Sequence, residues 1–333
     1  MSEQTPVRLA ILGAGTIGTI HGLCSLQVPE AVVTAVWSRS AVKAHSLAER
    51  LGARAYESVE EAISADDVDA VLVCTPTMLH KVHALAAIAA GKHVICEKPI
   101  ARHLAEADAM ISAAEDAGVQ LFVGHVVRFY PEFRRLHELV EEGAIGRPAV
   151  IHMSRVAAFP RGSGDWHNDL HASGGALLDM GIHDIDWLLW TLGPAVRIHA
   201  RGLFTQSRSF LDYALMTLRF ASGAIAHVET SWAEPEGFAV CGEIAGDRGL
   251  LAYDSANSSA LRIDLRQAPS APAGVNVPTT YTQRPPQVLQ LEHFCRCIQG
   301  REAPIITVLE AREALRIGLA GLESIRSGMP IVL

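Results

Sequence analysis

Six apolar runs alternate with helix-like stretches through the first 125 residues, and this alternation limits the possible folds of the chain more than any other feature. The runs are continuously apolar, which is typical of strands buried on both faces of a parallel sheet. The stretches between them carry helix signals, such as Ser58 with Glu61 at a capping-box spacing. We therefore predict a doubly wound parallel sheet whose six strands fall within residues 7–15, 31–38, 53–56, 68–76, 93–99 and 120–125.

The pattern changes past about His125. Longer strands with a two-residue period follow, such as residues 213–220 and 225–232, joined by Ala221-Ser222-Gly223 in the manner of an antiparallel hairpin. A second domain of α/β character with an open, largely antiparallel sheet is therefore expected, and Pro131 opens its first helix.

The chain as a whole is accordingly predicted to be an α/β protein with two domains. Residues 1–124 would form a dinucleotide-binding domain of the Rossmann type. Residues 125–333 would form an α/β domain that binds substrate and carries the contacts between copies of the chain.

The stretch GAGTIG follows the first predicted strand and opens a helix, which is the context that gives a GxGxxG motif weight. Gly13 would permit a tight turn, Gly15 would let the backbone approach a pyrophosphate, and Gly18 would let helix and strand pack closely. The expected cofactor contacts on this turn are Gly13, Gly15, Thr16, Ile17 and Gly18. The alternative is a glycine-rich turn with no ligand.

The end of the second predicted strand reads Trp37-Ser38-Arg39-Ser40. A carboxylate at this place accepts hydrogen bonds from the ribose 2'-hydroxyl and repels a 2'-phosphate. Because a guanidinium and hydroxyls stand here instead, with Lys43 nearby, we expect NADP(H) to be favoured through Ser38 and Arg39, with NAD(H) possible. In the alternative, Arg39 is a solvated loop residue that stacks on adenine.

Residues 177–190 read LLDMGIHDIDWLLW, a strongly apolar segment that still carries three aspartates and a histidine. In a helix, Asp179, His183 and Asp186 would share one face, while Asp184 would point elsewhere. An aspartate one turn from a histidine can orient the imidazole for proton transfer near neutral pH. Gly181, unfavourable in a helix, would be explained by a flat ligand that approaches the backbone. A buried and satisfied Asp–His network is an equally open reading.

Glu97-Lys98-Pro99 ends the fifth predicted strand, where doubly wound sheets place their ligands. The proline restricts the backbone of Lys98, and a lysine there could hydrogen-bond a substrate hydroxyl. A surface lysine after a strand is the simpler alternative.

Four motifs together resemble the Gfo/Idh/MocA family of oxidoreductases, which is named after glucose-fructose oxidoreductase and inositol dehydrogenase. They are GAGTIG, CTPTMLH at residues 74–80, AGKHVICEKPIA at 90–101 and GGALLDMGIHDID at 174–186. The resemblance covers nearly the whole chain. It implies a Rossmann domain joined to an α/β domain with an open sheet, and hydride exchange between a nicotinamide cofactor and a sugar or cyclic polyol.

Carried over by position, the resemblance also implies roles for individual residues. Lys98, Asp179 and His183 would be the catalytic set, with His183 as general acid/base, Lys98 polarising the reacting hydroxyl or carbonyl, and Asp179 positioning substrate. Further expected contacts are Thr75, Pro76, His80, Glu97 and again Lys98 to the cofactor, and Arg128, Trp166 and Asp169 to the substrate. His125-Val126-Val127 departs from the more usual polar residues before Arg128. A homodimer or homotetramer through the open sheet is implied as well.

Composition sets limits on partners and compartment. A net charge of -8 with 19% charged residues offers no basic surface for nucleic acid, so small molecules are the expected partners. No apolar run is long enough to span a bilayer and no signal peptide is evident, so we expect a cytoplasmic protein without membrane contact. The six cysteines are scattered without zinc spacing, which indicates reduced thiols.

Three alternatives stay open from the sequence. Folds of this type also occur as sensors that bind dinucleotide without turnover, and as NAD-dependent glycosidases in which the redox step is transient. Intact Lys98, Asp179 and His183 favour the dehydrogenase. A metal site built from His167, Asp169 and His171 is possible by helical spacing. That segment is predicted to be a loop, however, and hydride transfer needs no metal, so none is expected.

Overall fold

The structure is a computed structural model that describes residues 5–160, 165–204, 211–255 and 284–333. The chain divides into two compact units. The first unit comprises residues 1–129 with 282–312, and the second comprises residues 130–281 with 313–333.

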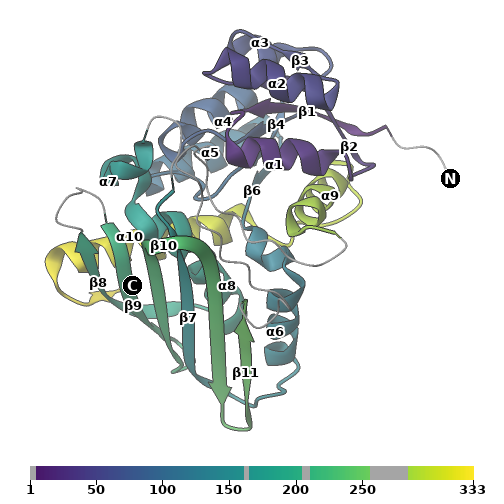
Figure 1. The fold of residues 1–333 in the computed structure, drawn as a ribbon. Coiled ribbons are helices and arrows are strands. Elements are labelled where there is room, and N and C mark those ends of the chain that lie inside the picture. The colour runs from purple at the N-terminus through teal and green to yellow at the C-terminus, as the bar shows by residue number, and fades with distance from the viewer. Residues whose placement is uncertain (1–4, 161–164, 205–210, 256–283) are drawn as a thin grey trace. The chain divides into compact units, whose positions relative to one another are not determined.

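The first unit contains a six-stranded sheet in the order β3-β2-β1-β4-β5-β6, and all of its strand pairs are parallel (Figure 1). Helix α1 contacts α2 and α9, while α4 contacts α3 and α5, as in a doubly wound fold with two helix layers. The predicted parallel sheet is therefore confirmed. The strands are β1 (Val7–Leu12), β2 (Ala31–Trp37), β3 (Arg54–Ala55), β4 (Ala70–Val73), β5 (His93–Cys96) and β6 (Leu121–Val123). The helices are α1 (Thr16–Ser25), α2 (Ala41–Leu51), α3 (Val59–Ser64), η1 (Thr77–Leu79), α4 (His80–Ala89), α5 (Leu104–Ala117), η2 (Val126–Phe129) and α9 (Pro286–Ile298).

Helix boundaries follow the residues that cap them. The Ser58 hydroxyl accepts a hydrogen bond from the Glu61 amide at 3.1 Å, which opens α3 as predicted. Gly118 ends α5 with φ 66°, a left-handed conformation that favours glycine.

The first unit includes a segment that the predicted domain division assigned to the second domain. Helix α9 carries Leu291 and Phe294, which share one buried apolar cluster with Leu9 and Phe122 of the parallel sheet. The rings of Phe122 and Phe294 stack with centroids 4.9 Å apart. The compact units therefore differ from the predicted division at 124/125, because the apolar face of α9 completes the core of the first unit.

The second unit contains a largely antiparallel sheet in the order β11-β10-β9-β8-β12, with β7 paired to β10. Val150 of β7 lies opposite Ile225 in one half of β10 and opposite Ala245 in the other, so β7 lies between the two halves of that long strand. Gly237, with φ 87°, lies between Glu234 and Phe238, where the pairing with β7 passes from one half of β10 to the other. The strands are β7 (Pro148–Ala158), β8 (Ala195–Phe204), β9 (Leu211–Phe220), β10 (Ile225–Gly246), β11 (Gly249–Asp254) and β12 (Ile331–Val332).

Helices cover one face of this second sheet. Added side-chain atoms at Gly318 and Gly321 of α10 would lie within 3 Å of Leu178 and Leu177, so α10 packs closely on the segment before α8. Helix α6 begins at Pro131 as predicted. The helices are α6 (Pro131–Glu141), η3 (Trp166–Asn168), α7 (Leu170–Ser173), the π-helical turn η4 (Leu177–Gly181), α8 (Ile182–Leu192) and α10 (Val308–Ser327).

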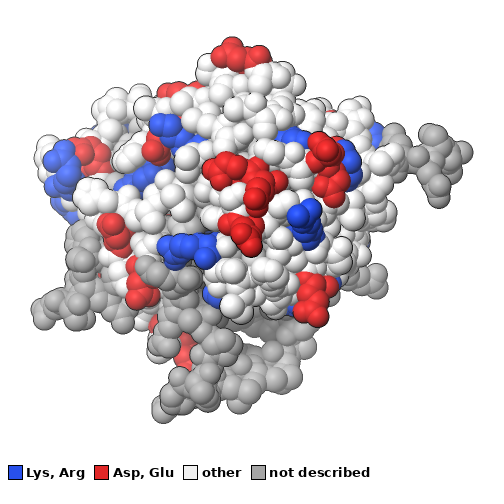
Figure 2. All heavy atoms as spheres, turned by 90° about the horizontal axis from the view of Figure 1, so that it is seen from above, with Lys and Arg blue, Asp and Glu red and all other residues white. Residues whose placement is uncertain are grey.

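The surface is mixed in charge. On the face shown in Figure 2, acidic and basic side chains lie interspersed among neutral ones, and the described part of this face has no continuous basic area. This distribution is typical of a solvated surface. Of the helices that the structure describes, none has the length and apolar character needed to cross a membrane.

Candidate functional site

The glycine turn after β1 has the geometry that a dinucleotide requires. Gly13 has φ 106°, and a Cβ atom there would lie 2.7 Å from the carbonyl oxygen of Cys74. A Cβ atom on Gly18 would lie 1.8 Å from the carbonyl oxygen of Gly13, so the helix can approach the turn only with glycine at this position. A Cβ atom on Gly15, by contrast, would meet nothing within 4 Å. The close packing thus falls on Gly13 and Gly18, and open space falls beside Gly15.

Helix α1 begins directly at this open space. Gly15 is its N-cap, and no side chain in the described residues caps it. The first amides of a helix lack partners within the helix, and they carry the positive end of its dipole. The space beside Gly15 and the amides of Thr16 and Ile17 therefore fit a pyrophosphate.

The end of β2 lies beside the same turn. The Gly13 amide donates to the Trp37 carbonyl oxygen at 2.7 Å, so the residues that follow Trp37 start next to the glycine turn. Ser38 is half-buried and Arg39 is exposed. The Ser40 hydroxyl accepts from the Lys43 amide at 3.4 Å and caps α2. This edge presents an arginine and hydroxyls and carries no carboxylate at residues 37–40.

His80 contacts the backbone of the turn after β4. Its ring nitrogens lie 2.9 Å from the carbonyl oxygens of Thr75 and Pro99, and the residue is 1% exposed. Burial lowers the pKa of His80 although both carbonyl contacts oppose this shift, and a neutral ring can donate to only one of them. His80, expected to line the cofactor pocket, thus joins two backbone segments. Thr75 and Pro76 remain half-buried at the turn itself.

Glu97 is held in place by hydrogen bonds from two elements. Its carboxylate lies 2.7 Å from Nε2 of His21 on α1, and it accepts the Lys98 amide at 3.1 Å. Burial alone would raise the pKa of Glu97, but the His21 hydrogen bond and the nearby charge of Lys98 hold it below its usual value. A Cβ atom on Gly124 would lie 3.0 Å from the carboxylate, so glycine there makes room for it. Glu97 therefore fixes the backbone of Lys98, whose peptide bond to Pro99 is cis.

Arg128, expected to contact the substrate, is buried within the first unit. Its side chain is 1% exposed, and Nη1 donates to the Ile305 carbonyl oxygen at 3.1 Å and to Glu310 at 3.0 Å. Both partners belong to the segment 282–312 of the same unit. The guanidinium thus anchors this returning segment, and contact between Arg128 and the substrate stays a prediction.

Asp179 and His183 stand out by their exposure. From Ala172 to Leu188 every residue is buried except these two, which are half-buried. Asp186, predicted on the same face, is 1% exposed. Residues 177–181 form a π-helical turn instead of the regular helix that the prediction assumed, and such turns are frequent at functional sites. The structure thus separates Asp179 and His183 from the buried residues around them.

Gly181 is explained by packing within the protein. A Cβ atom there would lie 2.8 Å from Cγ2 of Thr230 on β10 and 3.1 Å from Leu177. Close contact between the π-helical turn and the sheet thus accounts for a glycine at this position, and contact with a flat ligand stays a prediction.

Trp166 and Asp169 lie in the short helical segment before the π-helical turn. The Trp166 ring is centred 3.9 Å from that of the buried His167. The exposed carboxylate of Asp169 accepts the His171 amide at 2.8 Å and caps α7. Residues 161–164, which precede this segment, lie outside the described residues.

Lys98 belongs to the first unit, whereas Asp179 and His183 belong to the second. Within the ranges that the structure describes, no group of three or more His, Cys, Asp or Glu side chains is arranged to hold a metal ion. All six cysteines are free.

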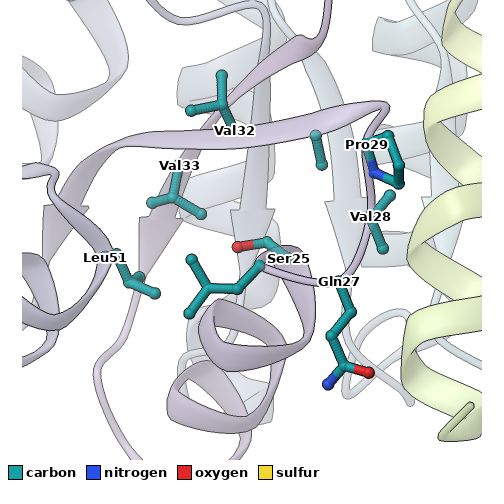
Figure 3. A pocket seen from close by; sticks show the side chains of 9 residues that line it. Ser25, Gln27, Val28, Pro29, Val32, Val33 and Leu51 are labelled. Carbon is teal, nitrogen blue, oxygen red and sulfur yellow. The ribbon is translucent and has the colours of Figure 1, made fainter.

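A surface pocket of about 350 Å³ lies elsewhere in the first unit (Figure 3). It is formed by the end of α1, the start of β2 and Leu51, and so lies at the amino end of β2, away from the glycine turn. None of its lining residues is ionisable, so it offers no charged side chain to bind a phosphate and no side chain that titrates near neutral pH. The lining residues are Ser25, Leu26, Gln27, Val28, Pro29, Ala31, Val32, Val33 and Leu51.

Sequence reasoning missed three features of the sites: the Glu97–His21 contact, the π-helical turn and a buried ion pair between Arg155 and Asp184. The last had one signal, since an aspartate in so apolar a helix requires a partner.

The parallel sheet and its glycine turn define a dinucleotide-binding protein. Residues 7–125 match the model of an oxidoreductase family with an NAD-binding Rossmann fold, and residues 133–252 match the GFO/IDH/MocA C-terminal domain. The chain belongs to the Gfo/Idh/MocA family of oxidoreductases and binds a nicotinamide dinucleotide.

Relatives and solved structures agree with this assignment. A myo-inositol 2-dehydrogenase of Thermotoga maritima is 30% identical over 98% of this chain and 98% of its own length. A D-xylose 1-dehydrogenase (NADP(+)) of Haloferax volcanii is 33% identical over 68% of this chain and 70% of its own length. The crystal structure of GenD2 from gentamicin A biosynthesis, in complex with NAD, is 25% identical with a TM-score of 0.90, covering 100% of this chain and 98% of that one.

Proposed function

We propose that this oxidoreductase transfers hydride between the nicotinamide and a carbinol or ketone carbon of a sugar or cyclic polyol. The observation that carries the proposal is the exposure of Asp179 and His183 alone within the buried run from Ala172 to Leu188. The relatives named for inositol and for xylose support hydroxyl-rich substrates.

Three residues would act on the substrate. His183 exchanges the hydroxyl proton as general acid/base, because an imidazole titrates near neutral pH. Asp179 positions the substrate, and Lys98 hydrogen-bonds the reacting oxygen and stabilises its negative charge. The bound nicotinamide supplies or accepts the hydride.

For the cofactor we propose a preference for NADP(H), with NAD(H) as the alternative. Support comes from the exposed Arg39 and from the lack of a carboxylate at residues 37–40, beside the glycine turn. Relatives of both kinds exist, since one is named for NADP(+) and one structure holds NAD. Fluorescence titration with NADPH and NADH tests this preference. Arg39→Ala should weaken NADPH binding about tenfold or more and leave NADH binding nearly unchanged, and equal affinity of the wild type for both cofactors would contradict it.

His183→Ala is the direct test of the acid/base role. We expect kcat to fall by roughly 100-fold or more while the Kd for cofactor stays near the wild-type value. His45→Ala, which removes an exposed histidine from α2, is the matched control and should retain full activity. An unchanged rate for His183→Ala would remove this residue from the chemistry. Tight cofactor binding without turnover of any sugar or polyol would instead favour a sensor or a glycosidase.

The free cysteines fit a reducing compartment, and we include a cytoplasmic location in the proposal.

A further inference from the structure

A buried ion pair joins β7 to α8 in the second unit. Arg155 Nε lies 2.9 Å from one Asp184 oxygen, and Nη2 lies 2.7 Å from the other, so the pair is bidentate. The side chains are 4% and 0% exposed. This contact provides a partner for Asp184, one of the three aspartates in the apolar segment 177–190.

The surroundings of the pair are mostly aromatic. The Phe238 ring lies 5.9 Å from the Arg155 guanidinium carbon, and Tyr130 and Tyr253 are the other titratable groups that act on this arginine. A buried ion pair can often be replaced by apolar side chains of similar volume without loss of stability, because removing the charges from water offsets their attraction. Stability alone is therefore a weak explanation for this pair, and a role in orientation becomes the better one.

Asp184 directly follows His183 in the first turn of α8. Neighbouring residues on an α-helix point about 100° apart, so a fixed direction for residue 184 also fixes the direction of residue 183. The π-helical turn 177–181 precedes α8, and its wider winding does not impose the register of a regular α-helix. The rotation of α8 about its axis therefore needs an anchor of its own.

We propose that Arg155 and Asp184 are positioning residues that set the rotation of α8 and thereby aim His183 at the substrate. The inference rests on the proposed acid/base role of His183. A planar arginine fork bound to both carboxylate oxygens defines direction as well as distance, which a single apolar contact does not.

The test removes the pair without leaving a buried charge. In Arg155→Met/Asp184→Leu the volumes are roughly kept, so we expect Tm within a few degrees of the wild type. We expect kcat to fall about tenfold or more, with the KM for cofactor unchanged, and the pH profile of kcat/KM to shift. Arg8→Met/Asp69→Leu is the control, because it removes another bidentate arginine–aspartate pair, a half-buried one in the first unit. This control should leave kcat and the pH profile of kcat/KM at the wild-type values.

A conservative variant covers the case in which the double variant does not fold. Arg155→Lys keeps the charge but loses the fork, and we expect it to fold with a partial loss of kcat, roughly three- to tenfold. Wild-type kcat and pH profile in the variants that fold would overturn the inference. Combining the pair substitution with His183→Ala should add little further loss, because the residues act as one unit. A full additional loss would also contradict positioning through His183.

Failure of the proposed function is recognised separately. It would be seen as wild-type activity in His183→Ala, whereas failure of the present inference would be seen as normal activity of the pair variants beside an impaired His183→Ala.

Discussion

At the scale of single residues, the three glycines of the first turn differ in what surrounds them. Gly18 would place a Cβ atom 1.8 Å from a backbone oxygen, whereas Gly15 would place one in open space. The sequence motif predicts this difference in role between Gly15 and Gly18, but it does not give the distances, because they depend on how closely the helix approaches the strand. Packing and ligand binding can therefore be tested apart.

Gly15→Ala and Gly18→Ala should fail in different ways. Gly15→Ala should fold with a Tm close to that of the wild type, while its Kd for NADPH rises about tenfold or more, because the methyl group enters the space for the pyrophosphate. Gly18→Ala should lose several kcal/mol of unfolding free energy or fail to fold. Thermal unfolding and fluorescence titration give both quantities. Normal cofactor affinity in a folded Gly15→Ala would show that the ligand does not approach this residue.

Glu97 has a pKa below its usual value in the folded protein, and this determines how its contribution depends on pH. A depressed carboxyl pKa means stabilisation that is fully present above the unfolded value, near 4.5, and is lost as the pH falls through the lower, folded value. Glu97→Gln replaces one acceptor oxygen by a donor, so we expect the unfolding free energy to fall by about 1–3 kcal/mol at pH 7. The difference in unfolding free energy between Glu97→Gln and the wild type should narrow below pH 4.5.

Chemical denaturation at pH 7 and at pH 3.5 to 4.5 measures this difference. Glu115→Gln, at an exposed position on α5, is the control and should match the wild type. A difference that stays constant down to pH 3.5 would contradict the role assigned to the ionised Glu97.

At the scale of elements, the segment 177–192 shows how far the sequence pattern reaches. Its apolar character and the spacing of Asp179 and His183 predict a helix with a polar side. Only the structure shows the π-helical turn, because the segment is apolar on nearly every side and so has no clear apolar period for an extra residue to shift. The partner of Asp184 was likewise out of reach, since Arg155 lies 29 residues away on a strand.

Gly181→Ala distinguishes packing from ligand contact in this segment. The new methyl group would crowd Cγ2 of Thr230, so we expect a loss of about 1–3 kcal/mol of unfolding free energy. Thr230→Ser removes that methyl group and keeps the hydroxyl, and the double variant should regain most of the loss. A stable Gly181→Ala with impaired substrate binding would instead support a ligand against this backbone.

Helix α9 shows a second limit of sequence reasoning at this scale. The first 125 residues predict the parallel sheet correctly, but α9 follows about 160 residues later and still completes its core. Chain order suggested that α9 belongs to the second domain. The apolar face of α9 is instead buried in the core of the first unit. A sequence pattern shows that a helix has an apolar face, but it does not show against which core that face packs.

At the scale of the whole molecule, we propose that copies of the chain associate as a dimer or tetramer through the outer face of the second sheet. Exposed apolar side chains on it include Val150, Leu203 and Leu215. Its charges are divided, with Arg201 on β8 and Glu243 on β10. A two-fold axis would bring the basic side of one copy over the acidic side of the other, which is self-complementary.

Charge reversal tests this arrangement. Light scattering at micromolar concentration should give more than a monomer for the wild type. Arg201→Glu should weaken association, and Arg201→Glu/Glu243→Arg should restore it at least in part. Only monomer in the wild type would contradict the proposal, and restored association in the double variant would distinguish charge pairing from a general loss of stability.

The most direct test of the account is turnover of the purified protein, followed by the absorbance of reduced nicotinamide at 340 nm across a panel of inositols, aldoses and ketosugars. We expect NADPH or NADP(+) to support turnover of at least one of them, and we expect Lys98→Ala, Asp179→Ala and His183→Ala each to reduce kcat/KM by roughly 100-fold. Turnover that survives unchanged in all three variants would contradict the account, as would tight cofactor binding with no turnover of any compound.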